Sequence, residues 1–143
     1  MKLLVSACLL GLPCRYDGGA KRLEGIGALL ERHECVPVCP EQLGGLPTPR
    51  PPAECREGRV FTREGADVTA EFERGAQAAL ELARLFGCEA ALLKERSPSC
   101  GCGVIHDGSF SGGLTAGDGV TAALLKAEGI PVYGESRLGE LPG

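Results

Sequence analysis

Three cysteines follow short apolar runs that the sequence predicts to be buried β-strands. The runs cover residues 3–5, 36–38 and 89–93, and the cysteines that come after them are Cys8, Cys39 and Cys100. If these strands are neighbours in a parallel sheet, their carboxyl ends meet at one edge, and thiols far apart in the sequence come together there. The sequence therefore predicts a metal site built from three thiolates.

Polar side chains beside two of these cysteines indicate chemistry rather than a purely structural metal. Glu41 lies two residues after Cys39, and the hydroxyls of Ser97 and Ser99 come shortly before Cys100. A reaction centre needs such groups to move protons and to position water. Glu41 and Ser97 are therefore candidate catalytic residues. Two structural alternatives stay open: Glu41 capping a helix or pairing with an arginine, and Ser97 capping the turn that follows it.

The residues alone leave the metal open, because three thiolates suit either of two centres. Zinc takes thiolate ligands and keeps a fourth position open in catalytic sites. A [4Fe–4S] cluster held by three cysteines leaves one iron without a protein ligand.

Five segments around these residues resemble a known bacterial family. They are residues 6–11, 14–18, 37–41, 44–54 and 94–101. Their order and spacing are similar, over nearly the whole chain, to the small proteins of the TudS-like (thiouracil desulfidase) family. The resemblance implies an enzyme that hydrolyses the C=S group of a thiolated pyrimidine to C=O and sulfide, without net redox change.

The resemblance also implies roles for individual residues. Cys8, Cys39 and Cys100 would hold a [4Fe–4S] cluster whose free iron polarises C=S as a Lewis acid, with Glu41 and Ser97 as catalytic residues. None of the other cysteines occupies a ligand position of the family pattern; we expect Cys88 in the core and Cys14 and Cys102 near the site, while Cys35 and Cys55 have no assigned role.

We further expect two substrate-binding residues, Arg50, which lies among prolines, and Ser99, which has the weaker claim. Two other functions stay open. One is a zinc-dependent hydrolase that uses the same three cysteines, and the other is a non-catalytic iron–sulfur protein for electron transfer or sensing.

The remaining pattern predicts a single α/β domain over residues 1–143. Apolar residues at helical spacing predict helices near residues 23–33, 69–87 and 118–129, with Thr69 and Asp118 as caps, and a last strand covers residues 131–133. Strands alternating with helices indicate a three-layer Rossmann-like parallel sheet, in the order 2-1-4-5, with peripheral hairpins near residues 59–68 and 104–114. The proline-rich stretch 40–52 is expected to form a rigid loop without helix.

Composition limits the partners and the location. The net charge is −4 and the pI is near 5.2, which argues against gripping a nucleic-acid backbone and favours a small thiolated base or nucleoside over thiolated tRNA. No run reaches the length of a membrane span, and the first residues lack an export signal, so we expect a cytoplasmic protein with reduced thiols. His33 and His106 fall outside the motifs and are expected on the surface.

Overall fold

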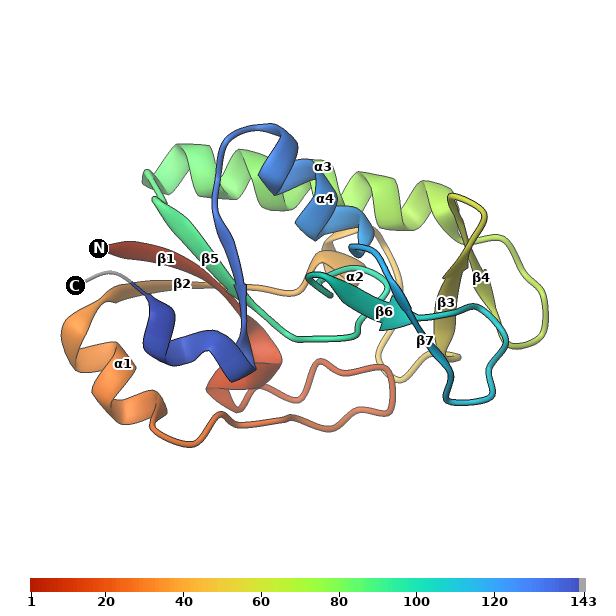
Figure 1. Cartoon of the computed structure of the whole chain (residues 1–143), viewed down its shortest axis with the longest axis horizontal. Coiled ribbons are helices and arrows are strands. Elements are labelled where there is room, and N and C mark those ends of the chain that lie inside the picture. The colour runs from red at the N-terminus through yellow and green to blue at the C-terminus, as the bar shows by residue number, and fades with distance from the viewer. Residues whose placement is uncertain (142–143) are drawn as a thin grey trace.

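Four parallel strands form the central sheet of the protein (Figure 1). The computed structural model describes residues 1–141. Its sheet contains β1 (Lys2–Ser6), β2 (Glu34–Val38), β5 (Ala90–Leu93) and β8 (Val132–Gly134), in the order β2-β1-β5-β8. All three neighbouring pairs are parallel. The expected α/β fold is confirmed, with the first strand inside the sheet between the second strand and the strand near residue 90.

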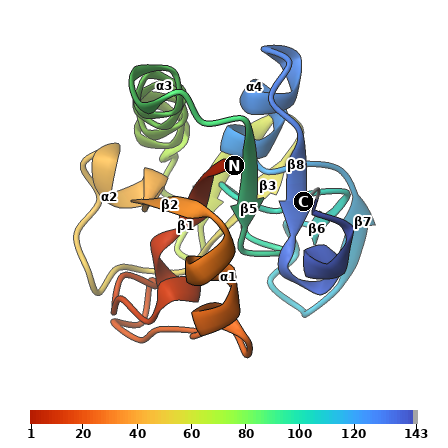
Figure 2. The ribbon, with the colours of Figure 1, turned by 90° about the vertical axis from the view of Figure 1, so that its left-hand side faces the viewer.

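Helices cover both faces of this sheet (Figure 2). The long helix α3 (Thr69–Phe86) and α4 (Val120–Ala127) lie on one face, while α1 (Ile26–Arg32) and the 3₁₀-helices η1 (Ala7–Leu10) and η2 (Glu135–Glu140) lie on the other. Successive residues of β1 serve the two faces: Leu4 packs in the cluster of α3 and α4, and Leu3 packs in the cluster of α1. This double burial explains why β1 and β5 read as continuous apolar runs. The second strand was also expected to be buried, but β2 lies at the sheet edge and only its last residue, Val38, is buried.

Several helix ends differ from the expected ones. The first helix begins at Ile26 rather than near Leu23, because Gly25 takes a left-handed conformation just before it. Neither predicted side-chain cap is present: the Thr69 hydroxyl accepts a hydrogen bond from the Val60 amide, and the Asp118 carboxylate accepts one from the Gly103 amide. Both side chains bind a neighbouring loop or strand instead of the first turn of their own helix.

Two antiparallel hairpins extend from the end of the molecule where the central strands finish (Figure 1). One joins β3 (Ala53–Arg56) to β4 (Arg59–Thr62), and the other joins β6 (Val104–His106) to β7 (Leu114–Ala116). The second was expected. The first hairpin differs from the expected one, in which residues 59–62 pair with residues 66–68. Instead β4 pairs with the preceding strand β3, and residues 66–68 contribute the bridge between Phe61 and Asp67.

The short helix α2 (Pro40–Leu43) crosses α3 where the two backbones touch. It occupies the start of the stretch that we expected to contain no helix, which is possible because a proline at the first helical position needs no amide hydrogen. A Cβ atom added to Gly75 would overlap the carbonyl oxygen of Pro40, and one added to Gly44 would overlap that of Glu71. These two glycines therefore fix the start of α2, with Cys39 and Glu41, against α3.

We expect Gly75→Ala to lower the free energy of unfolding by about 1–3 kcal/mol, because only a separation of α2 from α3 can relieve the overlap. Gly27→Ala is the matched control, since Gly27 also lies inside a helix but nothing lies within 4 Å of an added Cβ. That variant should gain about 0.5–1 kcal/mol. Urea unfolding followed by circular dichroism measures both, and equal stabilities would contradict backbone contact at this crossing.

Candidate active site

The three cysteines predicted to act together line one cavity of about 390 Å³. Cys8 lies in η1 directly after β1, Cys39 directly precedes α2 after β2, and Cys100 lies in the loop after β5. Cys8 and Cys100 are buried, and Cys39 is partly exposed. The parallel pairing of β2, β1 and β5 thus brings their side chains to one place, as the sequence pattern indicates.

A fourth thiol, that of Cys14, also lines the cavity and is buried. The Cys39 thiol lies 3.7 Å from the backbone oxygen of Cys14, to which it donates a hydrogen bond. The expected position of Cys14 near the site is therefore correct.

The remaining cysteines lie elsewhere. Cys88 packs in the core beside α3, as expected, whereas the Cys102 thiol points to the Val132 carbonyl oxygen and does not line the cavity. Cys35 and Cys55 also stand outside the cavity lining.

Burial raises the pKa of three cavity thiols, those of Cys8, Cys14 and Cys100, and so favours their protonated form when nothing binds them. It raises the pKa of Cys8, although Lys94 and Arg15 lower it in part. Burial also raises the pKa of Cys100 to about 12 and that of Cys14 to about 12, in the latter case with the added effect of the neighbouring Cys39. A thiol loses its proton when its sulfur binds a metal, so metal loading releases protons.

Glu41 and Arg50 form an ion pair in the wall of the cavity, in which Arg50 is buried and Glu41 is partly exposed. The Arg50 Nε atom lies 3.0 Å from Oε1 of Glu41, and the Arg50 side chain is only 4% exposed. The other guanidinium nitrogens donate to the backbone oxygens of Cys14 and Pro47 and to the Thr48 hydroxyl. Most donors of Arg50 are therefore used within the protein, and they hold the Glu41 carboxylate in one orientation.

Ser97 organises the loop that carries Cys100. Its hydroxyl oxygen accepts hydrogen bonds from the backbone amides of Ser99 and Cys100, both at 3.0 Å. This is the turn-capping role that the sequence leaves open. Because two donors already occupy the oxygen, the capacity that Ser97 has left is to donate its own hydrogen into the cavity that it lines.

Ser99 does not lie in the cavity wall. Its side chain is fully buried, and its hydroxyl makes a 2.8 Å hydrogen bond with that of Thr121 on α4. The structure therefore gives Ser99 a position that fastens the cysteine loop to α4, not a position where a substrate in the cavity would reach it.

Further cavity residues were missed or misplaced by the sequence analysis. His106 was expected on the surface but lines the cavity together with Phe110, both from the second hairpin. His33 was also expected on the surface but is buried at the end of α1. The cavity gathers more cations than carboxylates, and the cations offset the negative charge that bound thiolates bring; they are Arg15, Arg50, Arg63, Lys94 and Arg96, against Glu41, Glu54 and Glu95.

The donor set fits an iron–sulfur cluster better than a single zinc ion. Within residues 1–141, no group of three or more histidine, cysteine, aspartate or glutamate side chains stands close enough to hold one metal ion. The thiolates of a [4Fe–4S] cluster bind different irons, so they surround a larger object than a tetrahedral zinc ion. The three soft thiols around the cavity, those of Cys8, Cys39 and Cys100, are chemically suited to hold that cluster.

A parallel α/β fold that gathers cysteines, a carboxylate and a hydroxyl around one cavity defines a thiolate-liganded metalloenzyme. Residues 3–137 match the family model described as 2-thiouracil desulfurase, and the chain belongs to this family. It is 43% identical over 149 residues to the uncharacterized protein YbbK of Bacillus subtilis (strain 168), covering 97% of this chain and 99% of that protein.

A solved structure agrees with this assignment. The [4Fe–4S]-dependent thiouracil desulfidase TudS is 53% identical and superposes with a TM-score of 0.93, covering 98% of this chain and 94% of that one. The family resemblance noted from the sequence motifs is confirmed.

We expect protein purified without oxygen to be brown and to contain about four irons per chain. Replacing Cys8, Cys39 or Cys100 singly by alanine should abolish the colour, because each is expected to supply one thiolate ligand of the cluster. Cys88→Ala is the control, since Cys88 is a buried cysteine outside the cavity. Iron analysis and visible absorption measure the outcome. Stoichiometric zinc without iron uptake would overturn the cluster assignment.

Proposed function

We propose that this protein is a [4Fe–4S]-dependent desulfidase that hydrolyses the C=S group of a thiouracil-like pyrimidine. Water supplies the oxygen of the new C=O group, sulfide leaves, and no electrons are gained or lost overall. The observation that carries the proposal is the meeting of three strand-end cysteines with Glu41 and Ser97 around one cavity. Membership of the 2-thiouracil desulfurase family supports it.

The cluster, when bound, supplies a Lewis acid for the substrate sulfur through the iron that no cysteine holds. The side chains supply the proton transfers. We assign Glu41 as the base that takes a proton from the attacking water, since a carboxylate accepts protons and hydrogen bonds. We assign Ser97 as a hydrogen-bond donor to the reacting substrate, since its oxygen is already occupied by two backbone amides.

Arg50 acts through Glu41 in this proposal. The sequence suggests Arg50 as a substrate-binding residue, but four of its hydrogen bonds go to protein atoms, including the 3.0 Å bond to Glu41. We therefore propose that Arg50 is a positioning residue for the catalytic carboxylate. Ser99 has a comparable supporting role for the loop of Ser97 and Cys100, through its bond to Thr121.

We expect Glu41→Gln to keep the cluster and to reduce turnover by roughly 10²–10⁴, the range for loss of general acid–base catalysis. Glutamine keeps an oxygen that can accept the Arg50 hydrogen bond, so the wall should stay intact while the basic group is lost. Sulfide release from 2-thiouracil and iron content are measured together. Turnover near that of the unchanged protein would show that Glu41 has only a structural role.

The proposed substrate is a small thiolated base or nucleoside rather than intact tRNA. The chain carries a net charge of −4, which argues against tight binding of a phosphate backbone, and the cavity of about 390 Å³ is large enough for a single base or nucleoside. The orientation of the substrate in the cavity decides whether a sulfur at the 2-position or one at the 4-position of the ring reaches the reacting groups.

We expect excess thiolated tRNA to leave thiouracil turnover nearly unchanged at physiological salt. Phosphate contacts are the main source of affinity for nucleic acids, and few are available on this surface. A competition assay over a range of salt concentrations measures this. Strong inhibition that fades steeply as salt rises would instead identify an RNA substrate.

We also propose that the protein works in the reducing cytoplasm. All eight of its cysteines are free thiols, and those that hold a cluster have to stay reduced. Separately, none of the helices in residues 1–141 has the length and apolar character needed to cross a membrane.

A further inference from the structure

We infer that His106 is a substrate-binding residue of the cavity and that its imidazole forms a hydrogen bond with the ring edge of the thiolated pyrimidine. The inference rests on the proposed function, because the ligand it names is the substrate of that reaction. It adds a recognition group from a hairpin that carries none of the proposed catalytic residues or cluster ligands.

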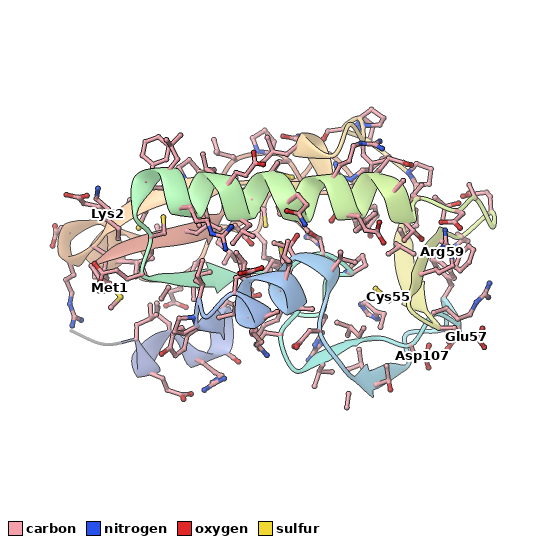
Figure 3. The ribbon with its side chains drawn as sticks, turned by 90° about the horizontal axis from the view of Figure 1, so that it is seen from above. Met1, Lys2, Cys55, Glu57, Arg59 and Asp107 are labelled. Atoms are coloured by element: carbon pink, nitrogen blue, oxygen red, sulfur yellow. The ribbon has the colours of Figure 1, made fainter. Side chains whose placement is uncertain are left out.

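His106 is held in place next to the catalytic loop. It is the last residue of β6, where it pairs with Leu114 of β7, and the residue before it, Ile105, forms a parallel bridge with Arg96. Arg96 directly precedes Ser97. Figure 3 shows the neighbouring Asp107 near Cys55, at the end of the molecule opposite Met1.

The imidazole has an unused hydrogen-bonding atom. Within residues 1–141, Nδ1 of His106 is the only buried side-chain nitrogen or oxygen without a hydrogen-bond partner. Buried polar atoms nearly always have a partner, because an unpaired one has lost its bonds to water without replacement. Nδ1 itself has almost no accessible surface, but no hydrogen bond holds it, so a turn of the imidazole about its Cβ–Cγ bond would present it to a ligand in the cavity that His106 lines.

The neighbouring groups leave this recognition role to His106. The Glu54 carboxylate accepts hydrogen bonds from the backbone amides of Gly108 and Phe110, so it holds the turn that follows β6. Arg63 lies 5.8 Å from the centre of the Phe110 ring and, like the other cations, can only donate. Glu41, which is paired with Arg50, is the proposed base for the attacking water.

A thiolated pyrimidine presents the complementary edge. Its ring N–H groups stand beside C=S and C=O, and a neutral imidazole nitrogen can accept from an N–H that cationic side chains cannot satisfy. Phe110, which also lines the cavity, adds apolar surface of the kind on which flat rings pack. His106 therefore fixes which ring edge faces away from the reacting C=S group.

The test compares variants that keep or remove the atom at the Nδ1 position. We expect His106→Leu to raise the KM for 2-thiouracil about 10–100-fold with little change in kcat, because one hydrogen bond of the bound substrate is lost. His106→Asn places an amide near the position of Nδ1 and should restore much of the affinity, whereas His106→Gln reaches past it and should not. His33→Leu is the control, as His33 lies outside the cavity.

N-methylated substrates separate a direct contact from a structural effect. Methylation of one ring nitrogen of 2-thiouracil should raise KM strongly for the unchanged protein and have little further effect in His106→Leu, because the same hydrogen bond is already missing. This non-additivity is the expected signature of contact. Iron content is measured for every variant to exclude cluster loss.

The outcomes are distinguishable. An iron-loaded unchanged protein that releases no sulfide from 2-thiouracil would refute the proposed function and this inference with it. Normal turnover together with an unchanged KM in His106→Leu, or equal losses on N-methylation in both proteins, would refute the inference alone. If His106→Leu fails to fold, the inference is still refuted when the unchanged protein shows the same KM for 2-thiouracil and for its N-methylated forms, whichever ring nitrogen is methylated.

Discussion

Parallel pairing of β1 with β2 and β5 decides where the chemistry of this protein takes place. Each strand must point the same way as its neighbours, so each ends at the same edge of the sheet, and the residue that follows it enters the same space. Cys8 and Cys39 follow their strands almost at once, and Cys100 is returned to the edge by the loop that Ser97 ties together. A slip of one strand by a residue would exchange its core face for the opposite face and move its thiol out of the cavity.

Beside this edge, the buried guanidinium of Arg50 is paired with the partly exposed carboxylate of Glu41. Removing two charges from water is costly, and the bond between them offsets this only with good geometry and further hydrogen bonds. Arg50 has those additional bonds, to Thr48 and to the backbone of Cys14 and Pro47. The proline-rich loop can therefore present a carboxylate with a fixed orientation, and the same arginine joins that loop to the segment that carries Cys14.

Sequence reasoning predicts the parts of this structure that depend on local burial. The buried strands β1 and β5 leave apolar runs, and the edge strand β2 leaves the short run that ends at Val38, so the sheet order and the convergence of the three cysteines that follow these strands were predictable. The segment 53–56 is polar and gives a weak strand signal, yet it pairs with β4 because Glu57 and Gly58 both adopt positive φ angles in the turn between them. Ser99 and His106 show the same difficulty, because only the packing of the loops decides that Ser99 faces Thr121 while His106 joins the cavity wall.

The hairpin of β6 and β7 supplies part of the cavity wall, apart from the strand ends that carry the proposed reactive groups. The proposed cluster ligands and the catalytic carboxylate are anchored to strand ends and to α2, whereas His106 and Phe110 belong to a hairpin that pairs mainly with itself. Changes in the length or the side chains of that hairpin can reshape the cavity while the strands that precede the cysteines keep their register. An engineer seeking desulfidation of bulkier thioamides therefore has a defined region to randomise, with the reactive centre left untouched.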